Sequence, residues 1–233
     1  MKKLLLMLLV VVAVLSTKQL SAQTQINQAN ISSFPYNITK SGSYILTSNI
    51  TVPLNVYAIY VTAPNVSINL NGFSLSGPLV CTTTCNNNVG TYGIYSTAAG
   101  LTVQNGSISG FYFGIYSGWP GTYKDLTISS SYFGIYGNSA TILNNTIYNC
   151  GGYGVWESFG TVSNNNIYNI GYTGIFANSA TVTNNNVAHS LYAGIYLETG
   201  LASGNATMYN QPNDLVLTYD AIGSNNACSS GAC

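Results

Sequence analysis

The sequence predicts an all-β solenoid, in which one chain winds into stacked coils of strands with about 20 residues in each coil. The main evidence is a motif of a glycine, a β-branched residue and an aromatic residue, which recurs at steps of 21, 20, 20, 20 and 20 residues. Its six copies are Gly93-Ile94-Tyr95, Gly114-Ile115-Tyr116, Gly134-Ile135-Tyr136, Gly154-Val155-Trp156, Gly174-Ile175-Phe176 and Gly194-Ile195-Tyr196. A second motif keeps the same phase, as "TILNNTIY", "TVSNNNIY" and "TVTNNNVA", starting at Thr141, Thr161 and Thr181.

Helical repeats do not fit this pattern. Apolar residues do not recur at helical spacing, and the charged helix formers are scarce, because Asp, Glu, Lys and Arg together make up 4% of the chain. Alternation of apolar and polar residues by twos favours strands instead.

Strand alternation also predicts which side chains point inward. We expect Phe133 and Ile135 on one side of a strand, and Gly134 and Tyr136 on the other. The predicted inward stacks are Ile94, Ile115, Ile135, Val155, Ile175 and Ile195, then Ile142, Val162 and Val182, and then Ile147, Ile167 and Val187.

Paired asparagines mark a bend between the second and third of these stacks. The pairs are Asn144-Asn145, Asn164-Asn165 and Asn184-Asn185. Asparagine tolerates the left-handed backbone conformation that a tight bend needs. Stacked copies can also hydrogen-bond to one another, so we expect an asparagine ladder along the solenoid.

The segment "GIYGNSATILNNTIYNCGGYGVW" resembles the repeat of right-handed parallel β-helix proteins of the pectate-lyase-like superfamily. Upstream, "ISSFPYNITKSGSYILTSNITV" and "AIYVTAPNVSINLNGFSLSG" are similar to the first coils of secreted members, and the likeness covers roughly residues 31–213. It implies a right-handed β-helix with an N-terminal cap and first strands over residues 23–57, coils over 58–213 and a C-terminal cap or tail over 214–233. The superfamily includes lyases, hydrolases, adhesins and binding proteins, so the resemblance implies a fold rather than a function.

The chain begins with "MKKLLLMLLVVVAVLSTKQLSA", in which two lysines precede an apolar run and a small residue closes the segment. This pattern is typical of a cleaved secretory signal peptide, which we place at residues 1–22. No later apolar run is long enough to span a bilayer. We therefore expect a secreted, extracellular or periplasmic protein without a membrane span.

Charge is almost absent from the rest of the chain. After residue 22 there are two lysines, five acidic residues and no arginine, a net charge of −3. So few cations exclude a nucleic-acid partner. Few ionisable groups also predict a stability that depends only weakly on pH.

Five cysteines in an exported chain favour disulfides. The simplest pairing joins Cys81 to Cys85 and Cys228 to Cys233, each within a short loop, and leaves Cys150 as a buried free thiol. The spacings are not those of a zinc site. We predict no metal and no cofactor.

Few residues could carry catalysis. The resemblance implies calcium-binding aspartates and a basic residue for a lyase, or clustered aspartates for a hydrolase, and neither set can be placed here. The weak candidates are Glu157 and Glu198, which are either an acid–base pair or two solvated carboxylates at the rim. His189 is expected to be a turn residue rather than a catalytic base.

Outward aromatic residues form the strongest candidate binding site. One column is Tyr95, Tyr116, Tyr136, Trp156, Phe176 and Tyr196, and a second is Tyr112, Tyr132, Tyr172 and Tyr192, interrupted by Gly152. With the repeated glycine between them, the columns predict a shallow glycine-floored channel suited to sugars. The alternative is that the aromatic stacks only stabilise the parallel strands. A third possibility is an ice-binding array on the column of Thr141, Thr161 and Thr181.

The preferred function is therefore a non-catalytic, secreted or surface-associated protein that binds extracellular polysaccharide or a cell-envelope glycan through its aromatic columns. The alternative is a polysaccharide lyase or glycoside hydrolase. Ionisable groups distinguish the two functions, because an enzyme requires at least two of them converging on one face and a binding protein does not.

Overall fold

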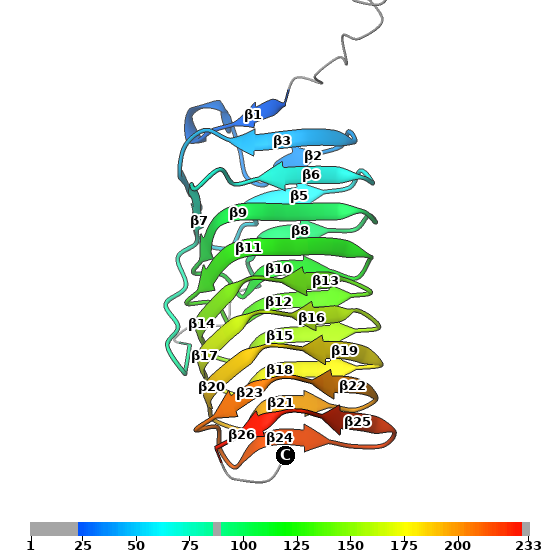
Figure 1. The fold of residues 1–233 in the computed structure, drawn as a ribbon. Helices are drawn as coiled ribbons and strands as arrows, with labels where there is room; N and C mark the ends of the chain where they lie inside the picture. The colour runs from blue at the N-terminus through cyan, green and yellow to red at the C-terminus, as the bar shows by residue number, and fades with distance from the viewer. Residues whose placement is uncertain (1–22, 86–89, 230–233) are drawn as a thin grey trace, which may run out of the picture.

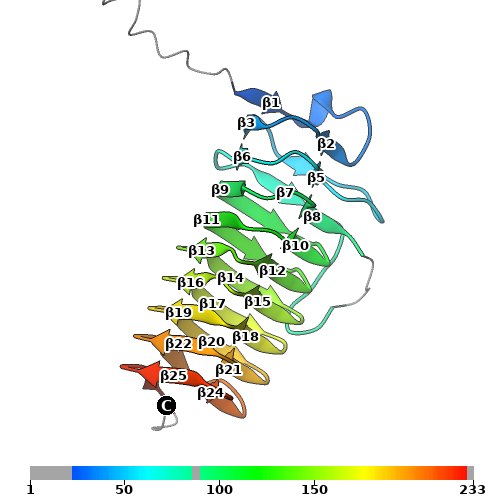
Figure 2. The same cartoon turned by 90° about the vertical axis from the view of Figure 1, so that its right-hand side faces the viewer.

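The computed structural model describes residues 23–85 and 90–229, and these residues form a right-handed parallel β-helix (Figures 1 and 2). Strands make up the regular structure of the described residues, apart from one 3-10 turn, η1 (Gln28–Asn30). Each strand pairs in parallel with its counterpart in the next coil, for example Ile135 with Val155 and Thr141 with Thr161. The predicted all-β solenoid is therefore confirmed.

One sheet of nine strands forms the first side of every coil. Its order follows the sequence: β2 (Tyr36–Ile38), β5 (Ile59–Val61), β8 (Tyr92–Ser96), β10 (Phe113–Ser117), β12 (Phe133–Asn138), β15 (Tyr153–Ser158), β18 (Thr173–Asn178), β21 (Ala193–Leu197) and β24 (Asn213–Leu217).

A sheet of seventeen strands forms the remaining sides of the coils. Its strands are β1 (Thr24–Ile26), β3 (Gly42–Leu46), β4 (Ile50–Thr51), β6 (Val66–Asn69), β7 (Ser74–Ser76), β9 (Leu101–Ser109), β11 (Gly121–Ser129), β13 (Thr141–Leu143), β14 (Thr146–Cys150), β16 (Thr161–Ser163), β17 (Asn166–Ile170), β19 (Ala180–Thr183), β20 (Asn186–Ser190), β22 (Gly200–Ser203), β23 (Ala206–Met208), β25 (Ala221–Ser224) and β26 (Ala227–Cys228).

The predicted apolar stacks fill the interior. The isoleucines and valines of all three stacks are fully buried, from Ile94 to Ile195 in the first, Ile142 to Val182 in the second and Ile147 to Val187 in the third. Because each coil supplies the same side chains at the same positions, the core continues from coil to coil without a boundary. Equivalent side chains can stack only if every coil has the same length, and this requires the regular 20-residue period.

Strict alternation fails at the repeated glycine, and the expected orientation of Phe133 was wrong. Phe133 points outward with Tyr136, whereas Gly134 and Ile135 both face the interior. A Cβ on Gly134 would collide with the carbonyl oxygen of Gly154 in the next coil. The glycine is therefore required by the close approach of neighbouring coils, and it cannot form the floor of an outward channel.

The asparagine ladder is confirmed. Asn144, Asn164 and Asn184 occupy the left-handed region with φ of 55–57°. The second asparagine of each pair is buried, and the Nδ2 of Asn145 donates to the Oδ1 of Asn165 at 2.9 Å. The same bonds link Asn165, Asn185, Asn205 and Asn226 in succession. They satisfy buried amides that would otherwise cost stability.

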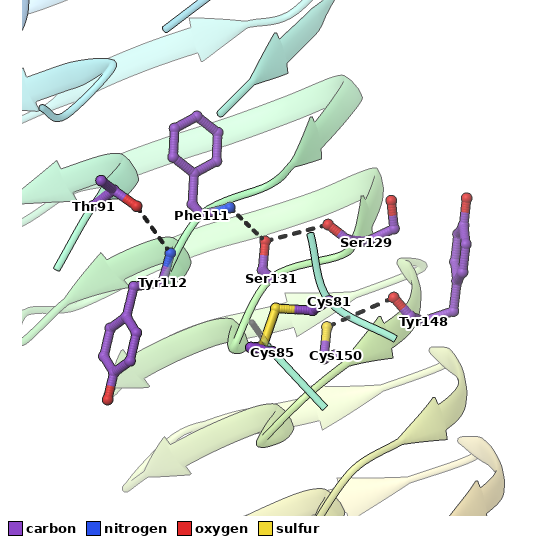
Figure 3. The surroundings of a disulfide bond; sticks show 9 residues. All are labelled: Cys81, Cys85, Thr91, Phe111, Tyr112, Ser129, Ser131, Tyr148 and Cys150. Carbon is purple, nitrogen blue, oxygen red and sulfur yellow. Dashed lines mark hydrogen bonds between the residues drawn. A yellow bond between two sulfur atoms is a disulfide. The ribbon is translucent and has the colours of Figure 1, made fainter. Parts of the chain in front are cut away.

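The predicted Cys81–Cys85 disulfide is present in a segment that runs down the outside of the coils (Figures 1 and 3). It lies against glycine turns of later coils, because a Cβ on Gly151 would collide with Cys85 Sγ and one on Gly171 would collide with the Thr83 carbonyl oxygen. Cys150 is a buried free thiol, as predicted, and burial raises its pKa to about 12.

Two further predictions concern the chain ends. The signal peptide at residues 1–22 lies outside the described residues, and so does Cys233, so the Cys228–Cys233 pairing stays a prediction.

No helix in the described part of the chain has the length and apolar character to cross a membrane.

Candidate functional site

Three columns of outward aromatic side chains cover the nine-stranded sheet, and we call them together the aromatic face. The first column lies just before the strands and comprises Tyr112, Tyr132, Tyr172 and Tyr192. The second occupies the first strand position and comprises Tyr92, Phe113, Phe133 and Tyr153. The third comprises Tyr60, Tyr95, Tyr116, Tyr136, Trp156, Phe176 and Tyr196.

The second column was missed by the sequence analysis. The signal that could have found it is the aromatic residue directly before the glycine in four consecutive copies of the motif, from Tyr92 to Tyr153. Simple alternation placed Phe133 inside, but the two successive inward positions of Gly134 and Ile135 turn it outward. The aromatic face is therefore wider than the sequence predicted, and the expected channel between two columns is filled by rings.

Rings within a column stack on one another along the solenoid. The centroids of Phe113 and Phe133 are 4.6 Å apart with planes at 14°, and those of Tyr116 and Tyr136 are 4.7 Å apart at 12°. Most contacts across columns are edge to face, as between Tyr153 and Trp156 at 4.8 Å, whereas Tyr92 and Tyr95 are tilted by 30°. Stacked rings present their edges and hydroxyl groups outward rather than their faces.

Trp156 is inclined to both of its neighbours in the third column, by 26° to Tyr136 and by 38° to Phe176. The largest tilt in this column, 58°, lies between Tyr95 and Tyr116. Trp156 differs from the other members in its ring, because a ligand there can contact an indole surface as well as ring edges.

The first column is interrupted at Gly152, as the sequence predicted. The ring of Tyr132 covers this glycine, because a Cβ there would lie 2.9 Å from its Cε1. Below the gap, Tyr172 packs edge-on against Tyr153 at 5.0 Å and stacks on Tyr192 at 4.4 Å. Tyr172 and Tyr192 are 39% and 40% exposed, so this pair is the most accessible part of the first column.

The tyrosine hydroxyls of the third column are available to a ligand. Within the described residues, none of the hydroxyls of Tyr60, Tyr95, Tyr116, Tyr136 and Tyr196 makes a hydrogen bond to another protein group. The pKa of Tyr95 is raised mainly by burial and to a smaller extent by the neighbouring tyrosines. The pKa of Tyr116 is raised mainly by burial and to a smaller extent by Tyr136. The hydroxyls of Tyr95 and Tyr116 therefore remain neutral donors and acceptors.

A column of polar residues borders the third aromatic column. Two positions further along each strand, on the same outward side, lie Asn138, Ser158, Asn178 and Glu198. Asn178 Nδ2 donates to Glu198 Oε2 at 2.5 Å, and Thr199 Oγ1 donates to Asn178 Oδ1 at 3.1 Å. Ring edges and fixed polar groups thus lie side by side.

The aromatic face ends in a shallow pocket near the N-terminus. Its volume is about 260 Å³, and it is lined by Pro35, Asn55, Val56, Tyr57, Tyr60 and Gly90. Tyr57 packs edge-on against Tyr92 at 4.6 Å and Tyr95 at 5.7 Å. A ring of a bound ligand could enter here beside Tyr57 and Tyr60.

Glu157 is not a solvated carboxylate at the rim. It follows Trp156 at the inward position that serine, glycine or alanine occupies in neighbouring coils, and its side chain is fully buried. Its Oε1 accepts a hydrogen bond of 2.8 Å from the backbone N–H of Ala140. Since Glu198 points outward, the two carboxylates do not converge and cannot work as an acid–base pair on one substrate.

The Glu157 carboxyl and the Tyr123 hydroxyl are two buried polar groups inside the apolar core. Glu157 Oε2 and the hydroxyl of the buried Tyr123 both lack a hydrogen-bond partner. Burial raises the pKa of Glu157 to about 8, an effect only partly offset by the bond from Ala140, and burial raises the pKa of Tyr123 to about 12. The raised pKa of Glu157 makes this one group an exception to the expected weak pH dependence, and it predicts that the stability changes with pH.

Other candidate residues stay apart from the aromatic face. His189 was expected in a turn, but it lies within β20, where it is exposed, has a left-handed φ of 55° and stacks on Tyr209 at 5.4 Å. Thr141, Thr161 and Thr181 line up on the seventeen-stranded sheet, Thr102 and Thr122 precede them in the same column, and Leu201 follows them. The column two positions further on is Gln104, Lys124, Leu143, Ser163 and Thr183, so only one of these coils carries threonine at both positions and the ice-binding hypothesis stays a prediction.

No protein-family model matches the sequence, and no curated protein matches it. Solved structures do match. One is a double mutant of the periplasmic alginate epimerase AlgG, with a TM-score of 0.47 and 12% identity, covering 88% of this chain and 72% of that chain. The strand pairings themselves establish that the chain has the parallel β-helix fold, and they confirm the architecture that the repeat predicted.

Two tailspike structures match at similar identity. The Dettilon tailspike protein (gp208) gives a TM-score of 0.41 and 12% identity, covering 84% of this chain and 60% of that chain. The enzymatically active domain of tailspike protein 2 of bacteriophage CBA120 gives 0.37 and 11%, covering 90% and 42%. This parallel β-helix therefore spans less than two thirds of either tailspike chain.

Proposed function

We propose that the protein is a secreted or surface-associated parallel β-helix that binds polysaccharide along its aromatic face without modifying it. The observation that carries this proposal is the combination of ring edges, unpartnered tyrosine hydroxyls and a bordering polar column on one sheet. Sugars offer both apolar CH groups and hydroxyls, so they match a surface that presents aromatic and hydrogen-bonding groups together.

The length of the aromatic face favours a polymer over a single sugar. The third column runs through seven coils, from Tyr60 to Tyr196. With neighbouring strands about 4.8 Å apart, it extends for roughly 30 Å. A chain of sugars could contact several coils at once, and repeated weak contacts on one rigid surface add up to useful affinity.

The test compares retention of the wild-type protein and Trp156→Ala on a panel of immobilised polysaccharides. Loss of the indole from the third column should weaken binding about fivefold or more, since aromatic anchors in an interface contribute more than about 1 kcal/mol each. The matched control is Tyr148→Ala, which removes a ring that stacks on Tyr168 at 5.1 Å on the other sheet. Its retention should equal that of the wild type.

Unfolding temperatures separate the proposal from a purely structural role for the rings. Both variants lose one stacked ring, so both should lower the Tm by a similar small amount. If Trp156→Ala lowers the Tm but binds polysaccharide as well as the wild type, the rings stabilise the sheet only. The proposal is then wrong.

A further inference from the structure

Charge is distributed very unevenly between the aromatic face and the rest of the molecule. The two lysines of the described residues lie away from its centre. Lys124 is in β11 of the seventeen-stranded sheet, where it pairs with Gln104 and Leu143. Lys40 follows β2 in the first coil of the nine-stranded sheet, seven strands before Glu198, or roughly 34 Å along the solenoid.

The outward-facing carboxylate beside the aromatic face is that of Glu198, which lies two positions after Tyr196 at the C-terminal end of the third column. Glu157, which follows Trp156, points inward and is buried. Asn178 donates a hydrogen bond to Glu198 Oε2, and Glu198 Oε1 makes no hydrogen bond within the described residues. Asp125 belongs to the other sheet, and Asp214 is buried among Asn210 and Ser229. A ligand on this part of the face therefore meets one negative charge and no positive one.

From this arrangement we propose that the aromatic face selects uncharged polysaccharides over polyanionic ones, and that Glu198 sets this selectivity. The inference rests on the proposed function. Recognition of sugar carboxylates or sulfates normally uses arginine or lysine, which pair with the anion directly. Here a polyanion would lose water from its charged groups, gain no cationic partner and approach a fixed carboxylate.

Uncharged sugars meet the opposite situation. Their hydroxyls can donate to Glu198 Oε1 and exchange hydrogen bonds with the tyrosine hydroxyls and with Asn138 and Ser158. A hydrogen bond from a hydroxyl to a carboxylate is stronger than one between neutral groups. The same residue that repels an acidic chain therefore helps to hold a neutral one.

The experiment is affinity electrophoresis of the purified protein in gels that contain one soluble polysaccharide each. The neutral probes are mixed-linkage β-glucan, galactomannan and dextran, and the acidic probes are polygalacturonate and alginate. We expect retardation by at least one neutral polymer and about tenfold weaker binding to both acidic ones, because two like charges about 4 Å apart oppose binding roughly fivefold in bulk water and more strongly near a protein surface.

Charge variants locate the selectivity. Glu198→Lys should bind polygalacturonate about tenfold more tightly than the wild type, and this gain should disappear in 1 M salt, where charges are screened beyond about 3 Å. Glu198→Gln and Asp125→Asn each remove one negative charge. Only the first should narrow the difference between neutral and acidic polymers, since Asp125 lies on the other sheet.

The outcomes distinguish the two proposals. Equal retardation by neutral and acidic polymers overturns the selectivity and leaves polysaccharide binding in place. Equal effects of Glu198→Gln and Asp125→Asn overturn the role of Glu198, because net charge alone would then explain the change. Binding to none of the five polymers counts against both the selectivity and the proposed function.

Discussion

The buried carboxyl of Glu157 should make the stability of the protein fall as the pH rises above about 4.5. Its pKa is raised from 4.5 to about 8 because the side chain is fully buried. Below about pH 4.5 the carboxyl is protonated in both the folded and the unfolded chain. Between pH 4.5 and about pH 8 the unfolded chain releases the proton and the folded chain keeps it, so unfolding becomes more favourable as the pH rises.

The size of the effect follows from the pKa difference. One pKa unit corresponds to about 1.4 kcal/mol. The rise to about 8 therefore implies a loss on the order of 5 kcal/mol between pH 4.5 and pH 8 and above. For a chain of this length, 1 kcal/mol changes the Tm by roughly 2–4 °C, so the Tm should fall by roughly 10–20 °C.

Thermal unfolding followed by circular dichroism at pH 5, 6, 7, 8 and 9 measures this directly. Glu157→Gln has nearly the same shape but no ionisable proton, so its Tm should change little over this range. Glu198→Gln is the control, and it should retain the wild-type slope because Glu157 is still present. A wild-type Tm that is equal at pH 5 and pH 9, or a Glu157→Gln variant with the wild-type slope, would refute the reasoning.

Two further predictions concern the contacts between coils. Gly134→Ala forces a methyl group against the Gly154 carbonyl, so it should lower the free energy of unfolding, measured by chemical denaturation, by about 1–3 kcal/mol. Its control, Gly118→Ala, should leave this free energy unchanged because no atom lies within 4 Å of the new Cβ. Asn165→Leu removes a buried amide from the asparagine ladder and should lower the free energy of unfolding by several kcal/mol. Its control, Asn164→Gly, should leave the stability nearly unchanged, because glycine readily adopts the left-handed φ of 55° at this position. Equal unfolding midpoints within either pair would contradict the packing described above.

The period of the repeat was sufficient to predict which residues lie above one another. Identical side chains at a spacing of 20 residues can bury their apolar groups only by stacking, which places Ile135 on Val155 and Asn145 on Asn165. The same argument correctly predicted the left-handed asparagines and the interrupted column at Gly152. These features are local or repeat with the period, so the sequence contains them.

Only the tertiary structure decided which way each side chain points and what crosses between coils. Gly134 and Ile135 both face inward because a neighbouring coil approaches the glycine too closely for any side chain. That break in alternation turns Phe133 outward and completes the aromatic face. The contact of Cys85 with Gly151 joins residues far apart in the chain, and it carries no periodic signal. The Glu157 side chain likewise occupies the space left by Gly137 and Ala177 in the neighbouring coils. The period of the repeat identifies these two neighbours, but only the packed coils show that a carboxyl group fits between them and turns inward.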